Sequence, residues 1–415
     1  MKKLMALLLA LVMVFSLVAC GESQPSTTPD KPSSPSPGGE NTPAAGNTPA
    51  AASDFTAALG FALSPDTLKK TGEKYKIVFI SFSWDNTIEH AAALMRHVLE
   101  PLGCEFTAIA SDSNPDTFIN NVENYVSQGY DGMILNVYST TSGRTAEILE
   151  EAGIPWMPFT SPPHDYDGNI VTPYIGVDDN YVGKRLVQEA LAWAKENWPD
   201  FDIKDTYIYM IDVSTAPELH ARVLAMNEEA QKTCPDAYKI EIGDSIAEGG
   251  GFSPEVAYNM CVRTFAANPD VKYWIVLHPF DYYVSGTCRA AEDYNMVDRV
   301  CTVCCNGDNY LPVLKDGTAG CWRFCLYWDN GLWGYLYACG IYALVSGACK
   351  PEELWSDYIV QGTDFANLRL ACIVMGPDNY EDVLGFYDNY TGYDYFGYAS
   401  KWKGTEYPVL YVPEA

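Results

Sequence analysis

Positive charge is scarce in this sequence. Its 26 Lys and Arg residues stand against 54 Asp and Glu residues, so the formal net charge is −28 at pH 7. Binding to nucleic acid requires a basic surface that neutralises phosphates, and this composition does not provide one. Anions are repelled by the same negative field, which also argues against a general anion-binding protein.

Catalytic motifs are missing as well. The chain has no G-x-S-x-G nucleophile turn, no H-E-x-x-H zinc motif and no phosphate-binding loop. Only five His residues occur, and His90, His97 and His220 fall within expected helices. Asp178 and Asp179 are the kind of carboxylate pair that a glycosidase uses, but neighbouring residues on an extended segment point apart. We therefore expect a binding protein without a cofactor. The alternatives are a sugar-active enzyme, a ligand-sensing surface lipoprotein and a purely structural surface lipoprotein.

Cysteine is plentiful, but its settings favour neither metal binding nor a disulfide framework. Most of the 13 Cys residues lie among apolar or small residues, where they act as small buried hydrophobes. The run "VCTVCC" has a C-x-x-C-C spacing, but on a strand Cys301 and Cys304 point to opposite faces. We expect no metal site there, and whether any of the other thiols pair is left open.

Residues 21–53 contain no aromatic, Leu, Ile or Val residue. Such a segment cannot bury enough apolar surface to offset its ordering entropy, so we expect a disordered tether. Residues 1–20 carry Lys2 and Lys3, an apolar run and then "LVAC". This pattern is typical of a bacterial lipoprotein signal peptide, in which cleavage leaves Cys20 as the lipidated N-terminus. The lipid would anchor the folded part to the cell membrane on its extracytoplasmic side. An ordinary secretory signal with a chance Cys is the alternative.

Short apolar runs alternate with helical periods from Tyr75 onward. "YKIVFISF", "EFTAIAS", "DGMILNVY", "IPWMPFT" and "YIGVDDN" are expected strands, and a second round begins at Thr206 with "TYIYMIDV". One apolar face is expected on the first helix, formed by Ile88, Ala91, Ala92, Met95, Val98 and Leu99. This rhythm predicts an α/β fold with two doubly wound parallel sheets in tandem, each covered by helices on both faces.

The order and spacing of these segments resemble the type I periplasmic sugar-binding proteins, of the ribose-binding kind, that serve bacterial ABC importers. The resemblance is carried by "SFSWDN", "NPDTFINNVENYVSQGYDGMILN", "AGIPWMPF", "IGVDDNYVGKRLVQ" and "FDYYVSGTCRAAED", and it covers about residues 75–360. It implies a substrate-binding lipoprotein whose two lobes close over a sugar or sugar-like ligand. The other expected partner is an ABC transporter permease.

The resemblance also implies lobe boundaries. The first lobe would comprise residues 75–178 and about 329–357, and the second residues 179–326 and part of 358–415. Three crossing segments would form the hinge, near Asp178–Asp179, Tyr327–Trp328 and Tyr358–Gly362. The Tyr-rich C-terminal tail would form an added lobe surface or cover the hinge.

Ligands of open α/β sheets bind beyond the carboxyl ends of the strands. In the first lobe the resemblance points to Trp84, Asp85, Asn86, Asn136, Tyr138 and Thr160. The flat ring of Trp84 suits the C–H face of a sugar, and Asp85 would accept hydrogen bonds from hydroxyls. Asn86 is expected to cap the following helix, with Glu89 completing a reciprocal capping box. The alternatives are that Trp84 packs on the lobe and that Asn86 only caps.

In the second lobe the resemblance points to Thr215, His220, Phe280, Asp281, Asn306, Tyr327 and Trp328. His220 stands where ribose binders carry a sugar-holding Arg, Phe280 where they often have Asn, and Asn306 where they have Asp. The implied pocket is more aromatic and less charged than a pentose site. It would suit an oligosaccharide, a nucleoside or another neutral polar ligand. The alternatives are a helix-face His at His220 and a helix N-cap at Asp281.

Overall fold

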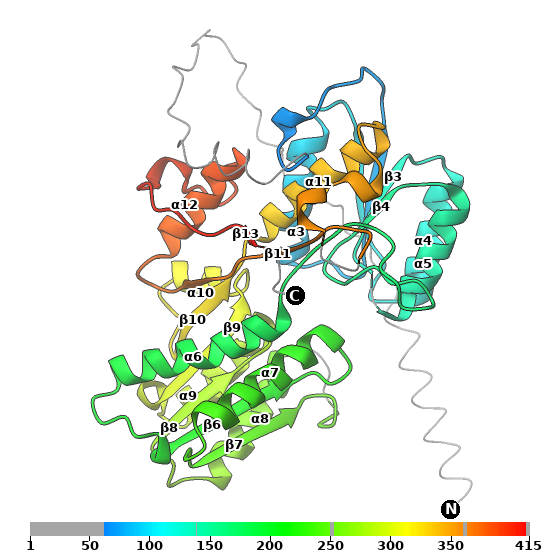
Figure 1. Cartoon of the computed structure of the whole chain (residues 1–415). Helices are drawn as coiled ribbons and strands as arrows, with labels where there is room; N and C mark the ends of the chain where they lie inside the picture. The colour runs from blue at the N-terminus through cyan, green and yellow to red at the C-terminus, as the bar shows by residue number, and fades with distance from the viewer. Residues whose placement is uncertain (1–61, 138, 250–252, 360–362, 412–415) are drawn as a thin grey trace, which may run out of the picture. The chain divides into compact units, whose positions relative to one another are not determined.

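The structure is a computed structural model, and it describes residues 62–137, 139–249, 253–359 and 363–411 (Figure 1). The expected signal peptide with Cys20, the expected tether and Tyr138 lie outside these residues. The described chain folds into three sheets and their helices, and two of the sheets are the doubly wound units that the sequence predicts.

The first sheet has four parallel strands in the order β2-β1-β3-β4. The strands are β1 (Lys76–Ser81), β2 (Glu105–Ala110), β3 (Gly132–Leu135) and β4 (Trp156–Pro158). Three helices connect or follow them, namely α3 (Asn86–Leu99), α4 (Pro115–Ser127) and α5 (Ser139–Ala152). Every residue of β1 after Lys76 is buried, which explains its unbroken apolar run. All six residues expected on the apolar face of α3 are buried, so that prediction is confirmed.

The second sheet has six strands in the order β12-β10-β9-β8-β6-β7. Five of them run parallel, namely β6 (Thr206–Asp212), β7 (Lys239–Asp244), β8 (Tyr273–Leu277), β9 (Val300–Asn306) and β10 (Trp322–Tyr327). The edge strand β12 (Ile373–Met375) pairs antiparallel with β10. The helices of this unit are α6 (Asp179–Asn197), α7 (Pro217–Thr233), α8 (Pro254–Ala267), α9 (Val284–Asp293) and α10 (Tyr310–Lys315). The predicted fold class, two doubly wound parallel-sheet units, is therefore confirmed.

A third, three-stranded sheet lies at the passages between the two units. It consists of β5 (Tyr174–Gly176), β11 (Asn367–Leu370) and β13 (Leu410–Tyr411), in the order β13-β11-β5. The chain passes from β5 to α6 at Asp178 and from β10 to α11 (Asn330–Val345) at Trp328. It passes from β11, which pairs with β5, to β12 at Ala371–Cys372. Residues 360–362 of the expected third crossing near Tyr358–Gly362 lie outside the described residues.

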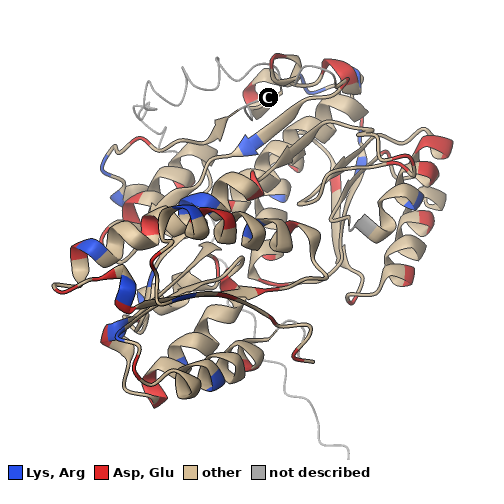
Figure 2. Ribbon diagram, turned by 60° about the horizontal axis from the view of Figure 1, so that its bottom comes forward, with Lys and Arg blue, Asp and Glu red and all other residues tan. Residues whose placement is uncertain are grey.

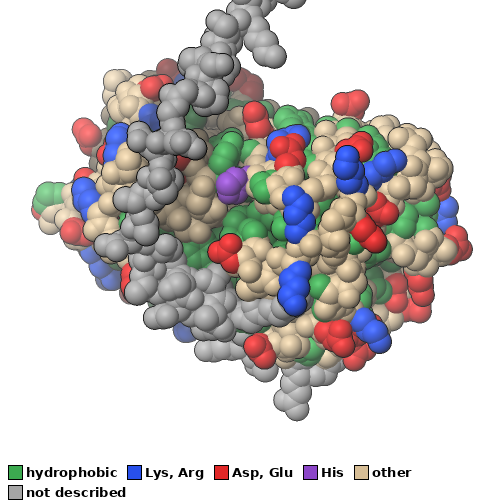
Figure 3. Space-filling view, turned by 90° about the horizontal axis from the view of Figure 1, so that it is seen from above, with side chains coloured by type: hydrophobic (Ala, Val, Ile, Leu, Met, Phe, Trp, Pro, Cys, Tyr) green, Lys and Arg blue, Asp and Glu red, His purple; other side chains and the backbone are tan. Residues whose placement is uncertain are grey.

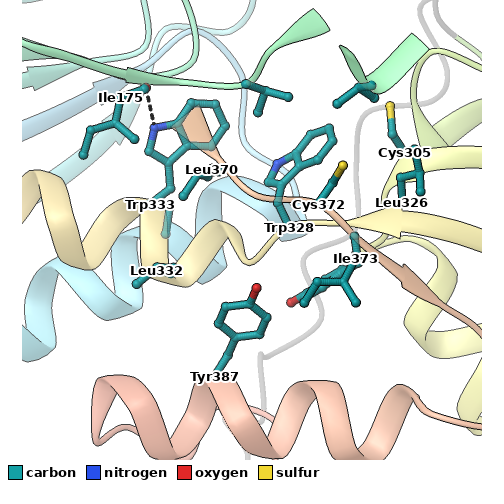
Figure 4. Close-up of a cluster of buried hydrophobic side chains, with 14 of the residues drawn as sticks. Ile175, Cys305, Leu326, Trp328, Leu332, Trp333, Leu370, Cys372, Ile373 and Tyr387 are labelled. Carbon is teal, nitrogen blue, oxygen red and sulfur yellow. Dashed lines mark hydrogen bonds between the residues drawn. The ribbon is translucent and has the colours of Figure 1, made fainter. Parts of the chain in front are cut away.

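A shared apolar core joins these passages (Figure 4). Trp328 and Trp333, which flank the start of α11, are 3% and 4% exposed and pack in one cluster with residues of β5, β11 and β12. Trp333 donates its indole N–H to the carbonyl oxygen of Ile175 at 2.9 Å. The Tyr337 hydroxyl accepts from the Ile175 N–H at 2.8 Å and donates to the same carbonyl at 2.6 Å. Helix α11 is apolar on all sides because nearly all of it is buried.

Three helix pairs approach closely enough to need glycine: Gly286 of α9 faces the carbonyl oxygen of Pro254 in α8, and two further pairs are similar. A Cβ at Gly334 of α11 would overlap the carbonyl oxygen of Ala91 in α3. A Cβ at Gly183 of α6 would likewise overlap the carbonyl oxygen of Arg222 in α7. Glycine lets the helix backbones meet directly at these three points, so each pair is packed more tightly than side-chain contact would allow.

The tail, defined as residues 376–411, packs over the hinge and touches both units. It contains α12 (Tyr380–Thr391), whose Tyr387 ring lies 6.0 Å from the ring of Tyr327 at the end of β10. Tyr395 stacks on His90 of α3 with ring centroids 4.1 Å apart. Phe396 lies under the ammonium group of Lys315 in α10 at 5.8 Å. Of the two positions left open by the sequence, the structure supports a tail that covers the hinge.

Charged side chains are spread over the surface rather than gathered in one basic patch. Lys and Arg residues stand among Asp and Glu residues along the helices (Figure 2). Both signs are also interspersed with apolar side chains on the face seen in Figure 3. Within the described part of the chain, no helix combines the length and the apolar composition needed to cross a bilayer.

Replacing Gly334 by Ala should destabilise the protein, because the added methyl group would collide with the backbone of α3. Overpacking of this kind typically costs about 1–3 kcal/mol of unfolding free energy. Gly376 is the matched control, since a Cβ there would meet nothing closer than 3.4 Å and Ala should be neutral or slightly stabilising. Urea denaturation of both variants checks this, and equal stability of the two would contradict the close packing of α11 on α3.

Candidate functional site

Asn136 holds together the carboxyl ends of three neighbouring strands in the first sheet. It follows β3 and is 6% exposed. Its side-chain oxygen accepts from the backbone N–H of Phe82, after β1, at 3.4 Å. Its Nδ2 donates to the carbonyl oxygen of Phe159 at 3.2 Å and to Oγ1 of Thr160 at 2.7 Å, both after β4. The amide is thus occupied by protein partners, and Asn136 positions the strand ends.

Two of the expected site residues have unusual backbone conformations. Thr160 has a φ of 78° and Asn306 a φ of 86°, in the left-handed region that side chains with a Cβ seldom adopt. For the β-branched Thr160 this conformation is strained, and Tyr174 helps to hold it by donating its hydroxyl to the Thr160 carbonyl at 3.1 Å. Such strain persists where surrounding structure fixes it, and it concentrates at ligand-binding positions.

Trp84, Asp85 and Asn86, which follow β1 after the half-buried Phe82 and Ser83, are exposed to solvent. Trp84 is 45% exposed, so it is not part of the core, and Asp85 and Asn86 lie beside it on the surface. The expected cap was wrong by one residue: Asp85 is the N-cap of α3, and its carboxylate accepts from the N–H of Ile88 at 3.0 Å. Asn86 is the first helical residue. Asp85 has the extended backbone that an N-cap requires.

His220 and Thr215 lie beyond the end of β6 in the second sheet. His220 is half-buried, and its Nδ1 is 2.7 Å from a carboxylate oxygen of Asp212, the last residue of the strand. Asp212 is buried and also accepts from the N–H of Val213 at 2.7 Å. Thr215 is exposed in the turn before α7. His220 is therefore oriented by a carboxylate behind it rather than left free on a helix face.

Asp281 organises the turn after β9 and does not cap a helix. It is 1% exposed, and its carboxylate accepts from the N–H groups of Gly307 at 3.1 Å and Asn309 at 2.7 Å. The Asn309 side chain donates to it at 2.9 Å. Burial raises the pKa of Asp281 to about 7, against the lowering effect of these donors. Phe280, just before it, is half-buried.

Asn306 at the end of β9 is where the two units and the hinge meet. Its Nδ2 donates to Oγ1 of Thr87 in α3 at 3.3 Å and, more weakly, to Asp281 at 3.4 Å. Its Oδ1 accepts from the side chain of Asn330, the first residue of α11, at 2.6 Å. Asn330 also donates to the carboxylate of Asp308 at 2.8 Å. These buried amides and carboxylates satisfy one another, as buried polar groups must.

Tyr327 and Trp328 belong to the hinge core. Both are buried; Tyr327 donates its hydroxyl to Asp329 at 2.8 Å, and Trp328 donates its indole N–H to Asn330 at 3.1 Å. The guanidinium of Arg222 lies 5.3 Å from the Trp328 ring. These contacts give both rings a structural role beneath the strand ends.

Arg222 is a buried cation beside the hinge core, and it forms an ion pair with Asp179. Its Nε lies 2.6 Å from the carboxylate of Asp179, at the first residue of α6. Its Nη1 donates to the carbonyl oxygen of Pro279 at 2.8 Å. The pair ties α7 to the first passage between the units, so Arg222 offers no free charge to an anionic ligand.

His90 is a residue that the sequence analysis left out of the site. It is 2% exposed, with Nδ1 3.6 Å from Asp308 and Nε2 3.8 Å from Asp329. Burial lowers the pKa of His90, but Asp329 and Asp308 outweigh burial and raise it overall. Tyr395 of the tail stacks on the ring. His90 thus joins α3, the turn after β9, the hinge and the tail.

The structure brings some of the expected residues together and leaves others apart. Asn136 meets Thr160, and Asn306 meets Asp281, each through a hydrogen bond. Trp84, Thr215 and the half-buried Phe280 and His220 stand at the strand ends without a described contact to those pairs. The missed residues are Thr87, His90, Asp308 and Asn330. A His on the apolar face of α3 was the one local signal for them; their partners come from distant segments.

The described residues form no group of three or more His, Cys, Asp or Glu side chains suited to a metal ion. Their twelve cysteines are free thiols, ten of them buried, so most fit the expected small buried hydrophobes. No curated protein matches the chain at a significant level.

A family model does match, and it decides the classification. The model of the periplasmic binding protein domain matches residues 77–348. The chain belongs to this family. Solved structures share the fold: a solute-binding protein from Bacillus halodurans C-125 with bound myo-inositol has a TM-score of 0.56 at 15% identity. It covers 74% of this chain and 96% of its own.

Two further solute-binding proteins are similar to the same extent. One from Agrobacterium vitis, bound to α-D-tagatopyranose, has a TM-score of 0.55 at 17% identity and covers 74% of this chain and 95% of its own. One from Thermotoga lettingae TMO, in complex with 5-methylthioribose, has a TM-score of 0.57 at 14% identity and covers 74% and 88%. The family model ends before the tail, so residues 376–411 are an addition to the matched domain.

The titration of Asp281 should lower the stability of the folded protein as pH rises from about 4 to about 7. Between about pH 4 and 7, folded Asp281 holds a proton that an unfolded Asp has lost, so folding takes up a proton and becomes less favourable as pH rises. The raised pKa of His90 acts in the same direction above about pH 6.5. Urea denaturation across this range measures the slope.

Asp281→Asn should make the unfolding free energy depend less steeply on pH, by an amount that corresponds to at most one proton, because the variant removes the titrating group. Asp200→Asn, at an exposed carboxylate beside Lys272, is the control and should leave the slope unchanged. An unaltered slope in Asp281→Asn would show that Asp281 does not take up a proton on folding.

Proposed function

We propose that this protein is an extracytoplasmic solute-binding protein that captures a sugar, or a sugar-like neutral polar ligand, for an ABC importer. The ligand lies at the carboxyl ends of the strands of the two sheets, where open α/β folds bind ligands. The two units close over it about the hinge core that contains Trp328 and Trp333.

One observation carries the proposal: an exposed indole stands beside a carboxylate at the end of the central strand β1. Trp84 is 45% exposed although a buried strand ends at Ser81, shortly before it, and Asp85 follows as the N-cap of α3. An aromatic face packs on the C–H face of a sugar ring, and a carboxylate accepts hydrogen bonds from its hydroxyls. His220 and Thr215 supply further polar groups from the second sheet.

Charge argues for a neutral ligand. Arg222 is paired with Asp179, and His90 lies between Asp308 and Asp329, so the buried cations beside the strand ends are already balanced. The chain as a whole carries a formal charge of −28. An anion would meet net repulsion, whereas a polyhydroxylated ligand would find acceptors and few competing cations.

The relatives support the same ligand class. Myo-inositol, α-D-tagatopyranose and 5-methylthioribose are the ligands of the three similar structures, and all are neutral polyhydroxylated molecules. Transporter binding proteins of this kind capture rather than convert their ligands, which supports a non-catalytic role. The site residues are proposed to act in two groups. Trp84, Asp85, Asn86, Thr215, His220 and Phe280 face the ligand. Asn136, Thr160, Asp281, Asn306, Tyr327 and Trp328 support them.

The N-terminal sequence supports membrane attachment. "LVAC" followed by Gly21 fits lipidation of Cys20, and residues 21–53 would then link the lipid to the folded domain. The permease would therefore receive its ligand from a tethered carrier.

Trp84→Ala should weaken sugar binding at least about tenfold while leaving the fold intact. Loss of a stacked aromatic contact is worth roughly 0.5–1.5 kcal/mol beyond buried area, and each 1.4 kcal/mol is about tenfold in affinity. A thermal-shift screen of sugars that includes myo-inositol, tagatose and 5-methylthioribose identifies the ligand to use, and calorimetric titration measures the change.

Tyr238→Ala is the control, because Tyr238 is 50% exposed but lies at the start of β7, away from the carboxyl ends. It should leave affinity unchanged. Full affinity in Trp84→Ala, with ligand binding proven in the parent protein, would remove Trp84 from the site.

Cys20→Ala should release the protein from the membrane fraction or leave it as an uncleaved precursor, because lipidation requires the thiol. Cys349→Ala, which changes a half-buried thiol of the folded domain, should be processed normally. Fractionation and intact mass measurement distinguish these products. Normal processing and membrane retention of Cys20→Ala would show that another segment anchors the chain.

A further inference from the structure

Two thiols of the second unit lie in contact with each other. Cys288, on α9, and Cys321, immediately before β10, have their sulfur atoms 3.6 Å apart. Cys288 is half-buried and Cys321 is fully buried. Neither lies at the strand ends proposed to bind the ligand, and Cys288 keeps partial exposure to solvent.

We propose that Cys288 and Cys321 form an intramolecular disulfide under oxidising conditions, which ties α9 to the start of β10. Two sulfur atoms at 3.6 Å are at van der Waals contact. A bond of about 2.05 Å then needs only rotation and a small shift of the two side chains. The bond would close a loop of roughly 30 residues that contains β9 and α10, so it would restrict the unfolded chain.

Four other cysteines have settings that do not favour pairing. Cys304 and Cys325 are partners in neighbouring strands, but both are fully buried and thus closed to an oxidant. Cys305 donates its thiol to the carbonyl oxygen of Pro279 at 2.9 Å. Cys349 is half-buried like Cys288, yet no sulfur contact to it is found among the described residues. Compared with these four, Cys288 alone combines partial solvent access with a sulfur neighbour, Cys321.

The reaction is thiol–disulfide exchange with a small oxidised thiol such as oxidised glutathione. The Cys288 thiolate attacks one glutathione sulfur, forms a mixed disulfide and releases one reduced glutathione. The Cys321 thiolate then attacks Cys288, forms the protein disulfide and releases the second reduced glutathione. The protein loses two hydrogen atoms, and the glutathione disulfide gains both. The hydrogen bond between the two thiols, together with burial, raises the pKa of Cys288, so exchange should be faster at alkaline pH.

The bond would act on the strand that leads to the hinge. β10 runs from Trp322 to Tyr327 and continues directly into Trp328. α9 packs on β9 and β10 on the outer side of the same sheet. Linking the two elements stiffens the second unit up to the hinge core without touching the proposed ligand site, so affinity for a sugar should change little while stability rises.

The experiment uses the full-length protein, reduced or treated with oxidised glutathione at about pH 8.5, where a larger share of the thiols is ionised. Peptide mapping without reduction should show one new species that joins the peptides of Cys288 and Cys321. Thermal unfolding of the oxidised protein should shift upward by several degrees, and reductant should reverse the shift.

Cys288→Ser should abolish both the joined peptide and the shift, whereas Cys349→Ser, the half-buried control, should keep both. Cys321→Ala tests the partner, and because Cys321 is buried its fold is checked by circular dichroism. If Cys321→Ala does not fold, Cys288→Ser still decides the matter. Free Cys288 and Cys321 after oxidation, a disulfide between other cysteines, or an upward shift that survives Cys288→Ser would each overturn the proposal.

Discussion

The whole arrangement depends on the core that Trp333 and Tyr337 build around the backbone of Ile175. These three hydrogen bonds fix the position of α11. This helix follows β10, the last parallel strand of the second unit, and packs on α3 of the first unit. Because α11 is apolar on nearly every side, every residue of it except Val345 is buried. The hinge is thus a packed core with satisfied polar groups, and the carboxyl ends of both sheets meet because this core holds them there.

The strand ends divide into a buried layer and an exposed layer. Asn136, Asp281 and Asn306 are buried, and they form hydrogen bonds with the backbone and side chains of neighbouring turns. An unsatisfied polar group in this position would be costly, so each has protein partners. Trp84 and Thr215 also follow strand ends, but they are exposed. The buried residues fix the conformation of the turns, and the exposed residues offer an aromatic ring and polar groups to a ligand.

The sequence predicted the parts of the structure that are encoded locally. Unbroken apolar runs located β1 and β6, and the 3.6-residue period located the buried face of α3, because burial of those residues follows directly from the pattern. The cap of α3 was misplaced because Asp85 and Asn86 are equally good capping residues, and only the backbone conformation distinguishes them.

Long-range features could not be read in this way. The passage at Ala371–Cys372 depends on the pairing of β11 with β5, two short strands nearly 200 residues apart in the chain. Asn330 and Asp308 were missed since their roles arise from contact with Asn306 and His90, which no local pattern encodes. The fold class could be predicted from the alternation of strands and helices in the sequence. The hydrogen bonds among Asn306, Asp308 and Asn330 could be seen only in the structure.

The tail gives the hinge a mechanical property that the matched domain alone would lack. Tyr395 stacks on His90 of α3, while Phe396 and Tyr398 lie against Lys315 of α10. A single short segment thus holds one helix from each unit. Any rotation that separates α3 from α10 must first pull these rings apart. The tail therefore supplies a restoring force against opening, anchored at both ends by aromatic contacts.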